Sequence, residues 1–250
     1  AFVLGQQLRA IGFNLDFAPV LDVDTNPANP IIGDRAFGRT SDVVVEHALA
    51  FADGLKAGGV LSCGKHFPGH GDTHQDSHVA LPTLPHDLAR LNEVELPPFR
   101  AAAGRVASVM TAHIVFEALD PNVPATMSKA AVSELLREDL GFDGAVFSDD
   151  LEMDAVTDNY EIDEAGVLSV EPGCDLLLVC SDLEAAAKLR ETLAKEAEKS
   201  EAFAARLEDA RARADALRRS ALDLPSPLPL QHALESPEAR AVKERLGQIE

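Results

Sequence analysis

Residues 60–78 read VLSCGKHFPGHGDTHQDSH, an apolar run that passes directly into a segment rich in glycine, proline and histidine. The apolar run predicts a strand from Val60 to Phe67. Pro68, Gly69 and Gly71 make a continuous helix after it improbable. The polar residues of 68–78 are therefore expected in a tight loop at the carboxyl end of a buried strand, a place where functional residues often lie.

The same strand-loop-helix pattern recurs along the chain. Further strands are predicted at Phe13 to Val23, Val106 to Ile114, Ala145 to Ser148 and Asp175 to Cys180. Helices are predicted at Ser41 to Ala57, Leu88 to Ala103, Ser128 to Leu140, around Ala165, from Ser181 to about Arg219, and at Ser236 to Gln248. Strands that alternate with helices indicate a parallel sheet covered by helices. The apolar character of the strands fits burial on both faces.

Two α/β architectures fit this order: an open doubly wound sheet and a (β/α)8 TIM-type barrel. No GxGxxG follows a strand, which disfavours a dinucleotide-binding sheet. Polar residues cluster where several strands end, as in a barrel that builds its site on one rim: Asp22, Lys65-His66, His113 and Asp149-Asp150. About five βα units fit here, so we expect a barrel whose first three or so units are missing from this chain. Residues 1–224 would form this partial catalytic barrel, and residues 225–250 a loop and short helix packed on it.

Composition excludes several classes of protein. The 250 residues are 46% hydrophobic, and Lys+Arg 22 against Asp+Glu 42 give a net charge of −20. Such an acidic chain repels phosphate backbones and anionic lipid, so neither nucleic acid nor a membrane is an expected partner. The three cysteines cannot all pair within one chain, which favours a reducing compartment and the cytoplasm. The first residue is Ala1 rather than Met, so export as a lipoprotein stays open.

Four histidines, at positions 66, 70, 74 and 78, fall at every fourth residue. On a helix they would form one metal-binding stripe, but the glycines and the proline between them disfavour a helix. A zinc site is the less favoured interpretation, and we expect neither a metal nor a cofactor.

Two groups could supply acid-base and nucleophilic chemistry. Asp76 lies two residues before His78, where a carboxylate can orient an imidazole and favour its protonated form, as a general acid/base requires. A surface hydrogen bond is the plainer alternative. Asp149 directly follows a strand and can act as a nucleophile at the rim. Asp150 can instead cap the following helix, because alternation turns the two carboxylates to opposite sides. His113 either faces the pocket or is a hydrogen-bonded rim histidine.

Taken together, KHFPGHG followed by DSH, GFDGAVFSDDLEM and FAPVLDV resemble motifs of family-3 glycoside hydrolases. The resemblance is to the bacterial β-N-acetylglucosaminidases that act on cell-wall fragments. It implies Asp149 as catalytic nucleophile and His78 as general acid/base, with Asp76 as its partner. It also implies that Arg35, Lys65 and His66 bind the N-acetylglucosamine unit. The histidine of the DSH motif separates this branch from β-glucosidases, which use a carboxylic acid from a second domain.

The expected function is therefore retaining, exo-acting hydrolysis of terminal β-linked N-acetylglucosamine through a covalent glycosyl-aspartate. The substrate would be a peptidoglycan or chitin-type fragment, the enzyme a monomer. Two alternatives remain at this stage: a β-glucosidase-like member of the same family, and a non-catalytic sugar-binding fragment.

Overall fold

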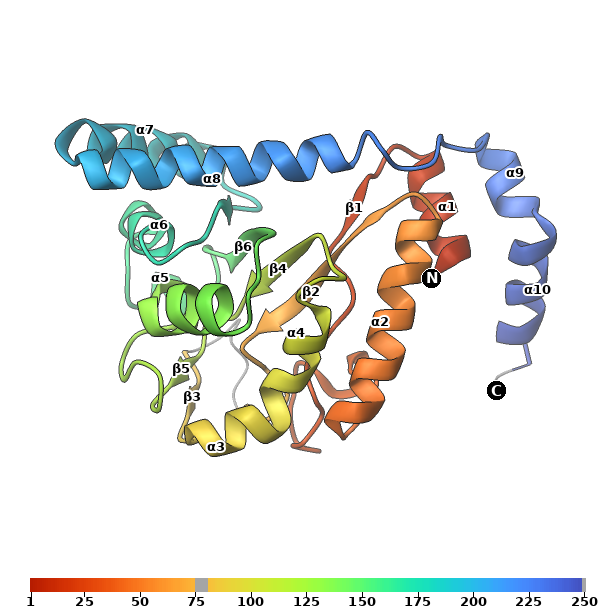
Figure 1. Cartoon of the computed structure of the whole chain (residues 1–250), viewed down its shortest axis with the longest axis horizontal. Helices are drawn as coiled ribbons and strands as arrows, with labels where there is room; N and C mark the ends of the chain where they lie inside the picture. The colour runs from red at the N-terminus through yellow and green to blue at the C-terminus, as the bar shows by residue number, and fades with distance from the viewer. Residues whose placement is uncertain (75–80, 249–250) are drawn as a thin grey trace.

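Five parallel strands form the central sheet of the protein in the computed structural model, which describes residues 1–74 and 81–248. Their order is β1 (Leu15–Asp16), β2 (Leu61–Phe67), β4 (Ser108–Thr111), β6 (Ala145–Asp150) and β7 (Leu176–Leu178) (Figure 1). Neighbours in the sheet are successive strands in the chain, apart from two short strands, β3 (Thr83–Leu84) and β5 (Val115–Phe116), which pair with each other. All these carboxyl ends therefore lie along one edge, as parallel pairing requires.

Helices cover one face of the sheet and enclose the main hydrophobic core. The elements involved are α2 (Ser41–Ala57), the π-helical η2 (Leu91–Glu95), which continues the short helix α3 (Leu88–Arg90), α4 (Leu96–Ala102) and the π-helical η4 (Ala130–Asp139). Helix α2 shows why these segments are helical: Val44, Ala48, Ala52 and Leu55 recur on one buried face. The helix ends before Gly59, whose φ of 94° is a conformation that glycine adopts readily.

The opposite face of the sheet has a smaller apolar cluster. Cys63, Met110 and Phe147 are buried at its centre, and they come from β2, β4 and β6. Half-buried residues surround them: Leu15, Phe17, Leu176, Leu178 and, from α8 (Glu201–Ser220), Leu217. Leu217 shows that the long helix α8 reaches this second face.

A buried carboxylate fastens α8 to the sheet. Asp175 has no exposed side-chain surface, and it accepts hydrogen bonds from Arg137 of η4 at 2.7 Å and from Arg206 of α8 at 2.6 Å. Its carboxylate also accepts the main-chain N–H of Val146 at 2.9 Å. One acid thereby joins η4 and β6 to α8, which lies much later in the chain.

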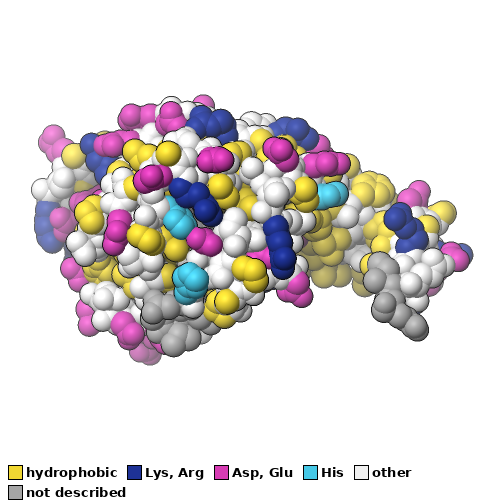
Figure 2. Space-filling view, turned by 90° about the horizontal axis from the view of Figure 1, so that it is seen from below, with side chains coloured by type: hydrophobic (Ala, Val, Ile, Leu, Met, Phe, Trp, Pro, Cys, Tyr) yellow, Lys and Arg dark blue, Asp and Glu magenta, His cyan; other side chains and the backbone are white. Residues whose placement is uncertain are grey.

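The remaining helices lie around this body. They are α1 (Phe2–Ala10), the short 3-10 turns η1 (Gly33–Arg35) and η3 (Ala125–Met127), α5 (Asp154–Thr157), α6 (Ile162–Val170), α7 (Leu183–Lys199), α9 (Leu230–Glu235) and α10 (Pro237–Leu246). Helices α9 and α10 lie at the end of the molecule beside α1 (Figure 1). Acidic side chains are spread over the face shown in Figure 2, interspersed with Lys, Arg and apolar groups. In the described part of the chain, none of the helices has the length and apolar character that a membrane span requires.

The predicted alternation of parallel strands and covering helices is confirmed, but the boundaries differ. Phe13 to Val23 contributes only the two residues of β1 and a bridge from Val20 to Lys65. Val106 to Ile114 shortens to β4, because the chain then leaves to pair with β3. The charged segment after Ser181 is two helices that meet at Ser200, and the tail has two helices rather than one. Within the described residues the sheet is open, with β1 and β7 at its edges.

Candidate active site

Lys65 and Asp149 lie at the carboxyl edge of the sheet, on the same face. Lys65 is two residues beyond Cys63 on β2, and Asp149 is two residues beyond Phe147 on β6, so alternation turns both toward the cluster of Cys63 and Phe147. Burial raises the pKa of Cys63 to about 12, while the Lys65 charge opposes this rise and the Asp149 charge adds to it. A cation and a carboxylate therefore share one half-buried rim, and the Asp149 side chain does not point into the helical layer.

Asp22 is a fully buried carboxylate at the same edge, and it holds His66. Its Oδ2 accepts from Nδ1 of His66 at 2.7 Å, and its Oδ1 accepts the main-chain N–H of His70 at 2.6 Å. The main-chain N–H of His66 donates to both oxygens, at 3.2 and 3.3 Å. Burial by itself raises the pKa of Asp22, but the His66 charge and the hydrogen bonds from His66 and His70 outweigh it, so the pKa falls below its usual value. Asp22 is thus an ionised anchor that leaves Nε2 of His66 for other contacts.

The loop that follows β2 is fixed to the segment after β1. The side-chain amides of Asn29 and Asn26 donate to the carbonyls of His70 and Thr73, at 2.8 and 2.9 Å. Gly71 lies so close to the main chain of Val23 that a Cβ would meet its carbonyl oxygen. The described stem of this loop is therefore rigidly placed, as far as His74.

Polar contacts hold the same stem from the other side. The hydroxyl of Thr25 donates to Asp72 at 3.0 Å, and Nε2 of His86 lies 2.8 Å from the second oxygen of Asp72. Arg90 pairs with the buried Glu95 at 3.0 Å, which lies against Gly69. Burial raises the pKa of Glu95, and the hydrogen bond and charge of Arg90 oppose the rise.

The predicted acid/base pair, Asp76 and His78, lies outside the described residues. Arg35, the third predicted sugar-binding residue, is exposed in η1 and donates to the Ile31 carbonyl at 3.1 Å. No hydrogen bond or ion pair between described residues joins Arg35 to Lys65 or Asp149. Of the predicted set, the structure therefore places Lys65 and Asp149 on one face of the carboxyl edge, and His66 follows Lys65 at the same edge, held by Asp22.

His113 and Asp150 have structural contacts. His113 is fully buried rather than open to the rim; burial lowers its pKa, and the Asp149 charge opposes the change. Asp150 accepts the N–H of Glu152 at 3.1 Å and so closes a turn. The prediction that it caps the next helix is wrong, because α5 begins only at Asp154 and Met153 is its N-cap residue.

Sequence patterns did not reveal the role of Asp22. The acid was visible at the end of a predicted strand, but its partners lie 44 and 48 residues away, and a local pattern does not specify such a pairing. Across the described chain, no group of three or more His, Cys, Asp or Glu side chains has the geometry of a metal site.

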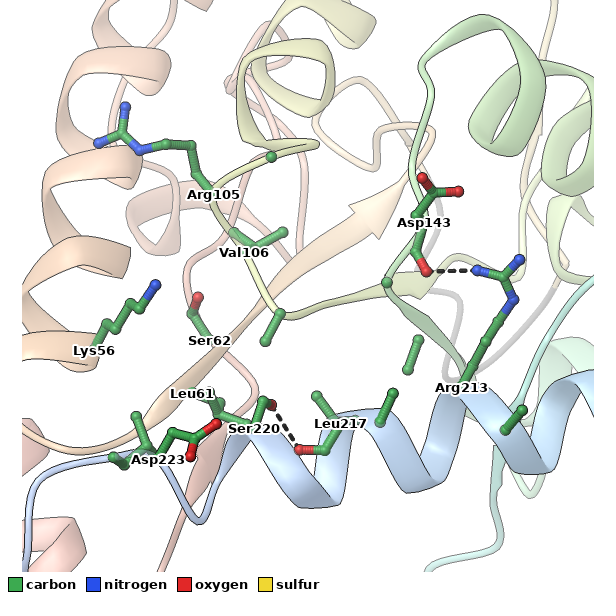
Figure 3. Close-up of a pocket in the computed structure, with 17 residues that line it drawn as sticks. Lys56, Leu61, Ser62, Arg105, Val106, Asp143, Arg213, Leu217, Ser220 and Asp223 are labelled. Carbon is green, nitrogen blue, oxygen red and sulfur yellow. Dashed lines mark hydrogen bonds between the residues drawn. The ribbon is translucent and has the colours of Figure 1, made fainter.

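A cavity of about 630 Å³ lies at the other end of the sheet, near the start of β2, β4 and β6 (Figure 3). Its floor is apolar, including Leu61, Val106 and Leu217, and charged side chains such as Lys56 and Asp143 stand around it. It is remote from the edge that holds Lys65 and Asp149, so we assign the candidate site to that edge, where polar groups converge.

Acidic and basic residues at the carboxyl ends of parallel strands define the place where α/β enzymes of the barrel type build their active sites. The chain matches the glycosyl hydrolase family 3 N-terminal domain over residues 1–217, and it belongs to that family. It is 43% identical over 190 residues to a β-hexosaminidase of Neisseria meningitidis, covering 76% of this chain and 52% of that protein. A β-hexosaminidase of Alkalilimnicola ehrlichii is 41% identical over 74% of the chain and 53% of its own length.

Solved structures agree with this membership. A family 3 β-N-acetylglucosaminidase from Paenibacillus superposes with a TM-score of 0.90 at 40% identity, over 97% of this chain and 47% of that one. A β-N-acetylhexosaminidase from Beutenbergia cavernae gives a TM-score of 0.81 at 35% identity, over 87% and 65%. The chain spans about half the length of the curated relatives it matches.

Proposed function

We propose that this chain forms the nucleophile-bearing part of a β-N-acetylhexosaminidase that removes terminal β-linked N-acetylglucosamine with retention of configuration. The observation that most supports the proposal is the shared rim of Lys65 and Asp149, beside a His66 that a buried carboxylate holds in place. The relatives named β-hexosaminidase and β-N-acetylglucosaminidase support the choice of sugar.

In the proposed mechanism Asp149 attacks the anomeric carbon and forms a glycosyl-aspartate. His78 first donates a proton to the glycosidic oxygen and later removes one from the attacking water. Lys65 donates hydrogen bonds to sugar hydroxyls, and Nε2 of His66, whose Nδ1 is held by Asp22, makes a further hydrogen bond with the sugar. Oδ1 of Asp149 accepts the N–H of Asp150 at 2.9 Å, which leaves Oδ2 as the attacking oxygen. Peptidoglycan or chitin-type fragments are the proposed substrates.

We also propose that the open sheet is part of a (β/α)8 barrel that further strands complete. The half-buried residues of the second face, among them Leu15, Phe17, Leu176 and Leu178, support this, because strands added at the β1 and β7 edges would cover them. The roughly half coverage of the relatives is consistent with such strands.

The decisive experiment incubates the chain with a slow fluorinated N-acetylglucosaminide and locates the adduct by peptide mass spectrometry. The label is expected on Asp149, absent in Asp149→Asn and retained in the matched control Asp150→Asn. Label on another residue, or on none while p-nitrophenyl N-acetylglucosaminide is hydrolysed, would overturn the assignment. Faster hydrolysis of the p-nitrophenyl glucoside would favour the β-glucosidase alternative, and sugar binding without label or turnover would favour a non-catalytic fragment.

A further inference from the structure

A series of hydrogen bonds runs from the end of β4 to the end of β6, where it reaches the main chain of Asp150, the residue after Asp149. The Thr111 hydroxyl lies 2.9 Å from that of Thr126, and the Thr126 hydroxyl lies 2.9 Å from Nδ1 of His113. Nε2 of His113 lies 3.1 Å from the main-chain carbonyl oxygen of Asp150. All three side chains are fully buried, so water does not compete for these contacts.

The proton positions in this series of hydrogen bonds follow from its last acceptor, the carbonyl oxygen of Asp150. A carbonyl oxygen only accepts, so Nε2 of His113 must bear the proton that it shares with Asp150. Burial lowers the pKa of His113 and so favours the neutral imidazole, which has a single N–H. Nδ1 is then an acceptor, and the single proton of the Thr126 hydroxyl is shared between Nδ1 and the Ala112 carbonyl oxygen, which lies 3.0 Å away. Thr126 in turn accepts from Thr111, whose hydroxyl also lies 3.4 Å from the Phe147 carbonyl oxygen.

Asp150 connects this series of hydrogen bonds to Asp149, the proposed nucleophile. Its carbonyl is held by His113, and its N–H donates to Oδ1 of Asp149 at 2.9 Å. On the β7 side the sheet register shifts between Phe147 and Asp150, although Asp150 still pairs with Leu178 and the N–H of Leu151 donates to the Leu178 carbonyl at 2.9 Å. On the β4 side the described register ends at Met110 and Phe147, and the His113 contact to the Asp150 carbonyl lies beyond that point.

We propose that His113 is a positioning residue: through the Asp150 carbonyl it fixes the main chain that orients the Asp149 carboxylate. This inference rests on the proposed role of Asp149. His113 has no exposed surface and does not reach substrate, so it acts only through the strand end. The hydrogen-bond donor at Nε2 of His113 is what this positioning role requires, and the volume of the imidazole ring is secondary.

Two substitutions by amide side chains separate the effect of the Nε2 donor from the effect of side-chain volume. His113→Gln places an N–H near the position of Nε2 and can keep the contact with Asp150. His113→Asn places its amide near Nδ1, where it meets Thr126 but falls short of Asp150. His47→Asn makes the same change at an exposed position of α2 and is the matched control.

The first measurement is amide hydrogen exchange by NMR, which does not require activity. In His113→Asn the Asp150 amide is expected to exchange at least about 10-fold faster than in the native protein, relative to the Val146 amide of the same strand. His113→Gln and His47→Asn are expected to leave the ratio unchanged. A general loss of stability would accelerate both amides and leave their ratio the same.

The second measurement is steady-state hydrolysis of p-nitrophenyl N-acetylglucosaminide. His113→Asn should lower kcat about 100-fold with little change in KM, as expected for a misplaced reacting group, while His113→Gln recovers most of the loss. Equal behaviour of the Asn and Gln variants in exchange would overturn the positioning role. If exchange behaves as expected but Asp149 takes no label, the proposed function fails and the structural role of His113 stands.

Discussion

Replacing Asp22 by alanine removes the acceptor of three buried N–H groups at once: the main-chain amides of His66 and His70 and the ring nitrogen of His66. Removing one partner of a buried, hydrogen-bonded charge pair typically costs about 3–5 kcal/mol. Three separate hydrogen bonds to a charged acceptor would add to about 4–9 kcal/mol, but water can enter the space and satisfy some donors. We therefore expect Asp22→Ala to lower the free energy of unfolding by about 4 kcal/mol at neutral pH.

The loss should depend on pH with a defined sign. The pKa of Asp22 is lower in the folded protein than its ordinary value of 3.8, so the ionised carboxylate stabilises the fold above that value. This contribution declines as the pH falls through the folded pKa, because the folded state must then take up a proton. The difference between Asp22→Ala and the native protein should be full at pH 7 and shrink below pH 3.8.

Denaturation in urea followed by far-UV circular dichroism measures the effect, since the chain has no Trp and a single Tyr for fluorescence. A loss of about 4 kcal/mol should lower the midpoint by more than about 1 M urea. Asp24→Ala is the control: among the described residues this carboxylate forms an ion pair with the largely exposed Arg39, a contact worth about 0–1 kcal/mol. Equal midpoint shifts for the two variants, or a deficit that grows toward low pH, would refute the anchor role of Asp22.

Three further outcomes are expected. Asp175→Ala should cost about 3–5 kcal/mol, because two arginines lose their buried partner; a thermal melt that matches the native one would contradict this. With a thiol-reactive disulfide reagent at pH 8, Cys180 alone should react in the native protein because it is exposed, and it should react slowly because desolvation and the contact with Asp150 raise its pKa to about 11; Cys63 and Cys174 are shielded by burial, which raises their pKa to about 12, so labelling of all three without denaturant would show that the core opens. Gly71→Ala should destabilise by at least about 1–3 kcal/mol by driving a Cβ into the Val23 carbonyl, whereas Gly104→Ala, which meets nothing within 4 Å, should be close to neutral in the same melts.

The parallel sheet and its helices could be predicted because their signals are local. The helix from Ser41 to Ala57 and the strand ending at Phe67 lie within a residue of their predicted limits, since apolar spacing and glycines mark both. The segment from Phe13 to Val23 could not be limited in the same way. Its composition favours a strand throughout, but Pro19 has no N–H to donate to the ladder, and whether a partner strand lies alongside is not a local property.

The candidate site could also be predicted only where its signals are local. Parallel strands bring their carboxyl ends together, so polar residues near the ends of predicted strands were enough to predict the place of Lys65 and Asp149. The contacts that hold them were not predictable, because Asp22 reaches across 44 residues to His66 and His113 across 37 to Asp150. Such pairs depend on the register of neighbouring strands, which single-residue patterns leave open.

The strand order has an evolutionary consequence for the catalytic edge. Lys65 and Asp149 are borne by β2 and β6, with β4 between them, so their strands stand about 10 Å apart. This separation is set by main-chain hydrogen bonds, which every amino acid except proline can make. Side chains inside the strands can therefore differ between related proteins, while the spacing between the strands that bear Lys65 and Asp149 stays the same. Divergent relatives could therefore replace many core residues and still bind a sugar ring of the same size.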